Sequence, residues 1–261
     1  MQARTNGIDT HYTIAGNGPW LVLSHSLACD VTMWDPQMDV LTQHYKVLRY
    51  DTRGHGKSSA PAGAYTLDML ADDLKALLDA VGATQVHFAG LSMGGMIGQT
   101  FALKYPGVLK TLTLADTTSK YAPEGAAMWE GRIKTVGEKG MSTILDGTLE
   151  RWFTAGFRQH HPDVIKAISA VILATPAAGY CGCGQAISKI NTTDRLKDIT
   201  AKTMIVVGAD DGGTPVAMSE TMRRAKPEAE FYIIKDAAHI SNIEKPAAFT
   251  HVLTTFLAKH R

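Results

Sequence analysis

The sequence lacks both a surplus of charge of one sign and a long apolar run. Its 261 residues carry 26 lysines and arginines against 25 aspartates and glutamates, a formal net charge of +1. Nucleic-acid-binding proteins usually show a strong basic excess, so this balance argues against a polyanionic partner. No run approaches the ~18 apolar residues of a membrane span, and Met1–Gly7 leads into no apolar signal segment. We therefore expect a protein that binds neither nucleic acid nor a membrane.

Cysteine is also scarce. The three cysteines, Cys29, Cys181 and Cys183, are an odd number, which suits a reducing compartment better than a disulfide framework. The spacing of Cys181 and Cys183 is too short for the usual zinc pair, and no second pair would complete a site. The sequence therefore predicts a cytoplasmic protein without a metal site, and nothing in it indicates another cofactor.

Short apolar runs alternate with amphipathic stretches such as Leu67–Val81. Strands that alternate with helices predict βαβ units, and hence an α/β protein with a mainly parallel sheet covered by helices on both sides. The first two candidate strands are joined only by Ala15–Pro19, too short for a parallel crossover, so we expect an antiparallel hairpin at the edge of the sheet. The candidate strands are Thr10–Ile14, Trp20–Ser24, Lys46–Tyr50, Gln85–Ala89, Thr111–Ala115, Thr203–Gly208 and Glu230–Ile234.

The alternation stops after Asp116 and strands resume at Thr203. Between them the periodicity predicts helices at Met128–Val136, Met141–Trp152 and Val164–Leu173. We therefore expect a core formed by residues 1–116 and 189–261, with a helical insertion at 117–188. Since open α/β sheets bind ligands at the carboxyl ends of their strands, this insertion is expected to form a lid there.

The segment Gly90-Leu91-Ser92-Met93-Gly94 follows an apolar strand and leads into Gly94–Ala102, which predicts a helix. A G-x-S-x-G sequence between strand and helix is typical of a nucleophile elbow, a turn so tight that only small residues fit two positions before and after the serine. Ser92 is therefore the candidate nucleophile.

A serine hydroxyl needs a base within hydrogen-bond reach and a carboxylate to orient that base. In folds with this elbow the acid and then the histidine follow the serine along the chain. His239 lies in a short loop after one candidate strand, and the Gly208–Pro215 loop after another carries Asp210 and Asp211. The fourth position of a Gly-x-x-Asp loop favours Asp211; the alternative is that Asp210 orients the base while Asp211 caps the next helix.

Two backbone N–H groups are candidates for an oxyanion hole. One belongs to Met93, directly after the nucleophile at a helix amino end, and the other to Leu27, in a loop after a candidate strand. We expect the side chains of both residues to form pocket wall. The Gly56-Lys57-Ser58 sequence is not a nucleotide site, because Asp51 stands where the phosphate-binding loop needs a glycine.

Taken together, these segments resemble the α/β-hydrolase superfamily, which implies a mostly parallel eight-stranded sheet with a lid after strand six. Within it the chain is similar to 3-oxoadipate enol-lactonases. That similarity is carried by Gly90–Gly98, by Glu150–Thr154 with Leu173–Tyr180, and by Asp236–Glu244. Two departures are His25, where we expect asparagine in that family, and the added sulfur of Cys181 and Cys183.

The resemblance implies hydrolysis of 3-oxoadipate enol-lactone to 3-oxoadipate through an acyl-enzyme, in the catabolism of aromatic compounds. The lactone carries a carboxylate, so its pocket should contain a cation. Arg132 is the first candidate for this cation, and Trp129 near it and His25 beside the oxyanion hole are further candidates for substrate binding. The other cations in question are Arg151, Arg158 and Lys120.

Two other functions are compatible with the same residues. A general carboxylesterase or a cofactor-free perhydrolase would use the same serine, acid and base, and would differ only in the pocket. A ligand receptor built on a hydrolase scaffold would keep the fold without the chemistry. The oligomeric state does not follow from the sequence.

Overall fold

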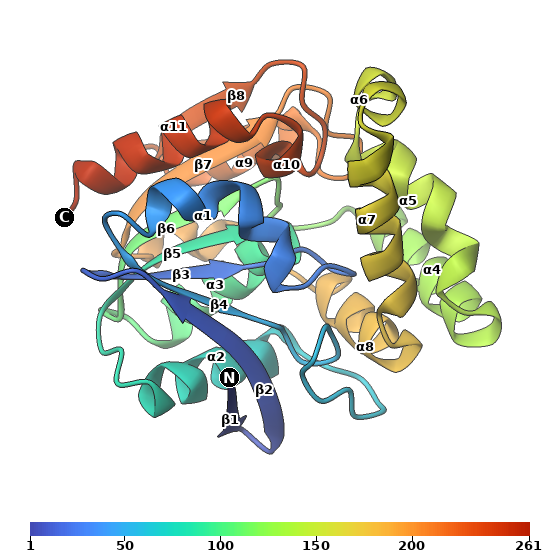
Figure 1. Cartoon of the computed structure of the whole chain (residues 1–261), viewed down its shortest axis with the longest axis horizontal. Helices are drawn as coiled ribbons and strands as arrows, with labels where there is room; N and C mark the ends of the chain where they lie inside the picture. The colour runs from blue at the N-terminus through green and yellow to red at the C-terminus, as the bar shows by residue number, and fades with distance from the viewer.

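The computed structural model describes the backbone of residues 1–261 and every side chain except that of Ala126. At its centre is an eight-stranded sheet with the order β1-β2-β4-β3-β5-β6-β7-β8 (Figure 1). The first two pairs in this order, β1 with β2 and β2 with β4, are antiparallel, and all other neighbours are parallel. The mostly parallel eight-stranded sheet is therefore confirmed. The strands are β1 Gln2–Thr5, β2 Ile8–Ala15, β3 Trp20–Ser24, β4 Lys46–Tyr50, β5 Val86–Leu91, β6 Leu109–Ala115, β7 Lys202–Gly208 and β8 Glu230–Ile234.

The expected hairpin between the strands at 10–14 and 20–24 is wrong. β2 pairs with β1 and with β4, where Tyr12 lies opposite Tyr50, and β3 lies between β4 and β5, parallel to both. The reason is burial. Consecutive residues of β3 are apolar, so both faces of the strand must be buried, as is typical of interior parallel strands. β2 alternates buried and exposed residues at its start, which suits a position near the edge. The polar β1 has no apolar pattern, and the sequence analysis missed it.

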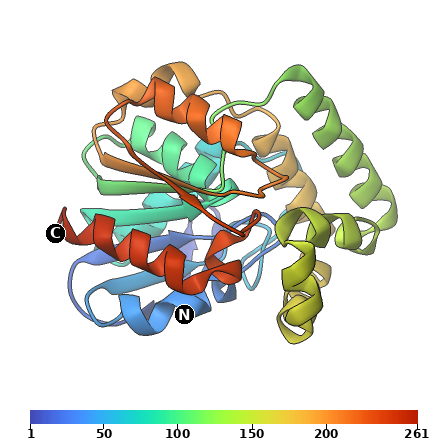
Figure 2. The same cartoon turned by 90° about the horizontal axis from the view of Figure 1, so that it is seen from above.

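Helices cover both faces of the sheet (Figure 2). One face carries α1 (Asp35–Leu41) and α11 (Pro246–Ala258), and the other carries α2 (Leu67–Ala80), α3 (Met93–Lys104) and α9 (Val216–Ala225). The expected amphipathic helix after Thr66 begins where the Thr66 hydroxyl accepts a hydrogen bond from the Met69 N–H. A short helix, α10 (Ser241–Glu244), precedes α11, and short 3₁₀ turns occur at Val31–Trp34 and Thr193–Asp198.

The segment between β6 and β7 is helical and lies beyond the carboxyl end of the sheet in both views (Figures 1 and 2). It comprises α4 (Pro123–Lys139), a 3₁₀ turn (Met141–Ile144), α5 (Leu145–Trp152), α6 (Ala155–His160), α7 (Pro162–Ala174) and α8 (Ala177–Ile187). The sequence analysis expected helices in the places of α4, α5 and α7 but missed α6 and α8. None of the described helices is by itself long and apolar enough to cross a membrane, although α7 and α8, bent by 92° at their junction, pass that test of length and composition as a pair.

Helix α8 packs directly on the loop that follows β4. A Cβ atom on Gly179 would lie 2.0 Å from the carbonyl oxygen of Gly54, and Gly54 itself has a φ of +83°. Only glycine fits so close a backbone approach at both positions. In the same region the Tyr65 N–H donates to the Gly182 carbonyl at 3.2 Å. These contacts seat the helical insertion on the core.

Candidate active site

The nucleophile elbow has the geometry that its sequence predicts. Ser92 has φ 57° and ψ −115°, in a region that costs a non-glycine residue about 1–3 kcal/mol. A Cβ on Gly90 would lie 2.2 Å from the Gly94 carbonyl oxygen, and a Cβ on Gly94 would lie 2.2 Å from the carbonyl oxygen of Ser24. Backbone atoms cannot yield at such distances, so both glycines are required for the turn.

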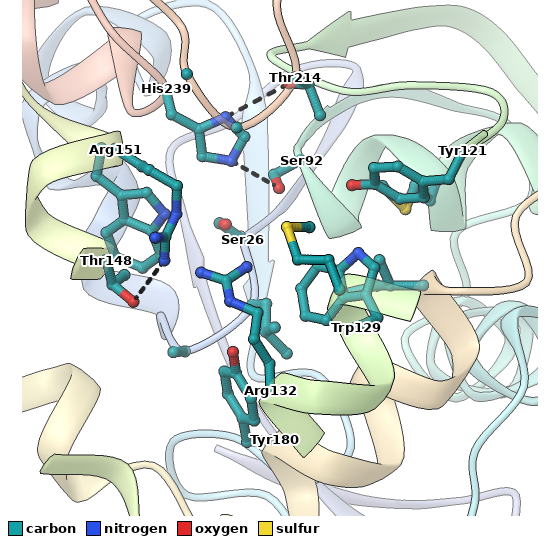
Figure 3. A pocket seen from close by; sticks show the side chains of 18 residues that line it. Ser26, Ser92, Tyr121, Trp129, Arg132, Thr148, Arg151, Tyr180, Thr214 and His239 are labelled. Atoms are coloured by element: carbon teal, nitrogen blue, oxygen red, sulfur yellow. Dashed lines mark hydrogen bonds between the residues drawn. The ribbon is translucent and has the colours of Figure 1, made fainter. Parts of the chain in front are cut away.

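Ser92, His239 and Asp211 lie in one hydrogen-bonded row, of which Figure 3 shows Ser92 and His239. His239 Nε2 is 2.9 Å from Ser92 Oγ, and His239 Nδ1 is 2.9 Å from each carboxylate oxygen of Asp211. A carboxylate only accepts hydrogen bonds, so Nδ1 carries the proton and Nε2 is free to accept from the serine hydroxyl. The three residues are 9 %, 5 % and 4 % exposed, so little water competes for these bonds.

Of the two candidate acids, Asp211 and not Asp210 contacts His239. Asp210 is exposed, whereas Asp211 is buried and also accepts hydrogen bonds from Gly213 N (2.7 Å), Thr214 N (2.9 Å) and Thr214 Oγ1 (2.8 Å). Burial opposes ionisation of Asp211, but the attraction of His239 and the hydrogen bonds from His239 and Thr214 outweigh it and hold the pKa of Asp211 below its usual range. The acid beside His239 is thus ionised at neutral pH.

A second buried acid, Asp116, lies at the end of β6 and was missed by the sequence analysis. Its carboxylate accepts from the Gly208 N–H at 2.8 Å and from the Ser241 hydroxyl at 2.5 Å. It therefore joins the loop that carries Asp211 to the segment after His239. Burial, and next the charge of Asp211, raise the pKa of Asp116 well above its usual range. The sequence signal that could have identified Asp116 is its position directly after the strand β6.

The two N–H groups expected to form an oxyanion hole have no hydrogen-bond acceptor among the described residues. Met93 is the first residue of α3, where an N–H lacks an intrahelical acceptor. Leu27 lies in a loop, and within the described residues its N–H has no hydrogen-bond acceptor. The Leu27 side chain lines the pocket, as expected, but that of Met93 is fully buried in the core instead.

His25 does not line the pocket. It is fully buried, its Nε2 accepts from the Thr52 N–H at 2.9 Å, and its Nδ1–H donates to the Ser26 carbonyl at 2.7 Å. Both ring nitrogens are thus occupied, and the residue does not line the pocket, contrary to the expectation of substrate binding. Because a trans peptide directs its C=O and N–H oppositely, holding the Ser26 carbonyl orients the Leu27 N–H.

A pocket with a cavity of about 100 Å³ opens beside the Ser92 hydroxyl (Figure 3). Its wall is mostly apolar, and the sequence candidates Trp129 and Arg132 both belong to it. The Arg132 guanidinium lies 5.1 Å from the centre of the Trp129 ring. The remaining apolar lining comes from Leu27, Ala28, Met96, Met128, Trp152 and Ile187.

The structure separates the four candidate cations. Arg132 and Arg151 line the pocket, whereas Arg158 lies 3.9 Å from Glu150 and does not line it, and neither does Lys120. Within the described part of the chain, neither pocket arginine has an acidic partner within 4 Å. Arg151 donates only to the Thr148 hydroxyl, at 3.3 Å.

The helical insertion is tied to the loop that carries His239. The buried carboxylate of Glu244 accepts from the Ala238 N–H (2.8 Å) and from Thr154 N (3.0 Å) and Oγ1 (2.5 Å). The carbonyl of Trp152 accepts from the Ile240 N–H at 3.1 Å. Glu244 is a further residue that sequence reasoning did not single out, although it closes the motif that begins at Asp236.

The Gly56-Lys57-Ser58 sequence lies in a loop arranged around a buried acid. The Asp51 carboxylate fills its own loop, accepting from Val31 N at 2.9 Å and Lys57 N at 2.8 Å, so the Gly-Lys-Ser sequence surrounds an acid and not a phosphate. Among the side chains that the structure describes, no group of three or more His, Cys, Asp or Glu is placed to hold a metal ion.

This fold and site define a hydrolase with a serine elbow. The family model for the alpha/beta hydrolase fold matches residues 19–246, and the chain belongs to that family. It is 34% identical over 241 residues to 3-oxoadipate enol-lactonase 2 of Acinetobacter baylyi, covering 92% of this chain and 89% of the relative. The crystal structure of the enol-lactonase from Burkholderia xenovorans LB400 is 36% identical, with a TM-score of 0.95, and covers 99% of this chain and 100% of its own.

The chain is therefore an ester-hydrolysing enzyme similar to 3-oxoadipate enol-lactonases. A more distant similarity is to RutD of Stutzerimonas stutzeri, which is named as a carbamate hydrolase and is 28% identical over 257 residues, 95% of this chain and 97% of the relative.

Proposed function

We propose that the protein opens a small enol-lactone that bears a carboxylate, converting 3-oxoadipate enol-lactone to 3-oxoadipate. The observation that carries the proposal is the position of Arg132. Its guanidinium lines the same pocket as Ser92 and His239 and has no acidic partner within 4 Å among the described residues. A half-buried guanidinium without a counter-ion favours a ligand that brings a carboxylate. The similarity to enol-lactonases supports the same substrate.

In this proposal Ser92 is the nucleophile and His239 the base. Ser92 Oγ attacks the lactone carbonyl while its proton passes to His239 Nε2, and Asp211 stabilises the imidazolium. The N–H groups of Leu27 and Met93 hold the negative oxygen of the tetrahedral intermediate.

Collapse of the intermediate breaks the ring C–O bond and releases an enolate oxygen, which takes the proton from His239; the resulting enol then tautomerises to the 3-oxo group of the product. An enolate leaves more easily than an amine, so no stronger acid is needed. A water molecule then gives a proton to His239 and attacks the acyl-enzyme, and Ser92 regains its proton as the second carboxylate forms.

We also propose that the core carries out catalysis and that the helical insertion recognises the substrate. Residues 1–116 and 189–261 supply the row of Ser92, Asp211 and His239, and residues 117–188 act as a lid that supplies recognition. The proposal is supported by the lining of the pocket, whose wall across from Ser92 comes from the insertion, including Trp129 and Arg132. We further propose that the enzyme acts in the catabolism of aromatic compounds.

The decisive experiment is direct turnover of 3-oxoadipate enol-lactone, followed by loss of its ultraviolet absorbance. We expect kcat/KM for this lactone to exceed that for p-nitrophenyl acetate by several orders of magnitude, and Ser92→Ala to remove both activities without changing the melting temperature. A carbamate belongs in the same panel, because RutD is named for that activity. Fast hydrolysis of the acetate ester or the carbamate with slow opening of the lactone would contradict the proposal.

The role of Arg132 is tested separately by Arg132→Gln, with Arg158→Gln as a matched control on the insertion but outside the pocket. Loss of one charge-assisted hydrogen bond is worth about 1.5–3 kcal/mol, so kcat/KM for the lactone should fall roughly tenfold to a hundredfold. Hydrolysis of uncharged p-nitrophenyl acetate should change little. Equal effects of the two substitutions would remove Arg132 from the substrate site.

A further inference from the structure

The pocket has one cation more than the lactone needs. A substrate with a single carboxylate occupies one guanidinium, yet both Arg132 and Arg151 line the pocket. No aspartate or glutamate lines the wall beside them, and neither arginine has an acidic partner within 4 Å among the residues described. Two cations share a confined pocket that contains no carboxylate, which favours a ligand with two negative charges.

Arg151 is held at a different wall from Arg132. It comes from α5 whereas Arg132 comes from α4, and both guanidinium groups point into the space below Ser92 and His239 (Figure 3). The Arg151 Cγ atom lies 4.0 Å from where a Cβ on Gly212 would be, so its stem lies beside the loop that carries Asp211. The next residue, Trp152, is tied to the His239 loop through Ile240, which limits how far Arg151 can move.

The chemistry of ring opening supplies the second charge. Adding water across the C–O bond of a carboxylate-bearing lactone gives a second carboxylic acid, which loses its proton at neutral pH, so a monoanion becomes a dianion. The new carboxylate forms at Ser92, which lines the same pocket as Arg151. The product, and not the substrate, therefore matches the charge of the pocket.

We propose that Arg151 forms a second anion subsite, so that the pocket binds linear dicarboxylates of about six carbons more tightly than the matching monocarboxylates. The choice of six carbons rests on the proposed function, since it is the chain length of 3-oxoadipate. A consequence is inhibition by the product: Arg151 contributes more to holding the dianion than to binding the monoanionic lactone. One guanidinium–carboxylate contact is expected to change the affinity roughly tenfold to a hundredfold.

The test is calorimetric titration of the wild-type protein with adipate and with hexanoate, which have the same chain length and differ by one carboxylate. We expect adipate to bind at least tenfold more tightly. In Arg151→Gln this preference should disappear while the affinity for hexanoate stays nearly unchanged, and Arg151→Lys should restore part of it. Arg158→Gln, on the same insertion but outside the pocket, should behave as wild type.

Equal affinities for adipate and hexanoate in the wild type would overturn the proposal. So would an Arg151→Gln variant that keeps the preference, or one that weakens both ligands equally. An Arg151→Gln variant that lowers kcat for the lactone but keeps its affinity for adipate would instead assign Arg151 to the transition state, and would also overturn it. Titration needs no turnover, so a failed lactone assay with a confirmed dicarboxylate preference would refute the proposed function alone.

Discussion

Asp211→Asn is the substitution that tests the proposed chemistry most directly. The carboxylate Oδ1 accepts from Gly213 N and Thr214 N, and an asparagine oxygen can keep both bonds. The amide NH₂ then replaces Oδ2, one of the two carboxylate oxygens that lie 2.9 Å from His239 Nδ1. An NH₂ group donates and therefore opposes the proton on Nδ1; when it pairs with Nδ1 the proton moves to Nε2, which can then no longer accept from Ser92. The loop should therefore persist while the base is in the wrong tautomer.

The expected loss is large. In serine proteases the equivalent change lowers kcat about 10⁴-fold, which corresponds to about 5.4 kcal/mol of transition-state stabilisation. We expect a similar loss here because Asp211 is 4 % exposed and water cannot easily replace its charge. The fold should be kept, since the two backbone hydrogen bonds that hold the loop survive the substitution.

The matched control is Asp210→Asn, which removes a neighbouring carboxylate that is exposed and does not contact His239. Initial rates with the lactone and with p-nitrophenyl acetate, together with melting temperatures, are measured for both variants. We expect Asp210→Asn to lie within a factor of about two or three of wild type, as surface substitutions usually do. If Asp210→Asn lost as much activity as Asp211→Asn, or if Asp211→Asn kept a tenth of it, the assignment of the acid would be refuted.

Two further predictions concern stability and are checked by urea unfolding. Gly94→Ala should lose about 3 kcal/mol, since its Cβ would lie 2.2 Å from the Ser24 carbonyl oxygen, whereas Gly131→Ala, in α4 with no atom within 4 Å, should gain about 0.5–1 kcal/mol. If both substitutions lowered the free energy of unfolding equally, the argument that a clash of the added Cβ destabilises Gly94→Ala would be contradicted. Burial and the nearby His25 lower the pKa of His55 to about 3, so the unfolded chain binds a proton near pH 6.5 that the native state does not. Stability should therefore fall as the pH drops below 6.5, by about 2 kcal/mol from this group between pH 7 and 5. His55→Gln should remove that part of the pH dependence, and an unchanged dependence would contradict the argument.

Much of the fold and part of the site follow from local sequence. A strand, the Gly-Leu-Ser-Met-Gly turn and a helix are contiguous, so the position of Ser92 at a strained turn is encoded within the single segment 86–104. Asp211 and His239 follow the ends of β7 and β8, and parallel strands bring those ends to one edge of the sheet. The order of elements along the chain is thus sufficient to predict that the three loops converge.

The direction of a side chain is harder to predict, because it depends on residues far away in the sequence. His25 has the polarity of a binding residue, yet Thr52 and Ser26 occupy both of its ring nitrogens, and the first of these comes from the loop after another strand. Sequence spacing likewise cannot distinguish Arg151, which faces the pocket, from Arg158, which reaches Glu150 instead. Both outcomes are decided by how the insertion packs.

The attachment of the insertion suggests how one chemistry serves different substrates. Two contacts attach the insertion to the core: Gly54 packs against α8, and Glu244 joins Ala238 to Thr154. Helix α4 carries Trp129 and Arg132, and both residues line the pocket. No residue of α4 takes part in the contacts at Gly54 or at Glu244. We therefore expect substitutions along α4 to change which substrate is preferred while the row of Ser92, His239 and Asp211 keeps its hydrogen bonds.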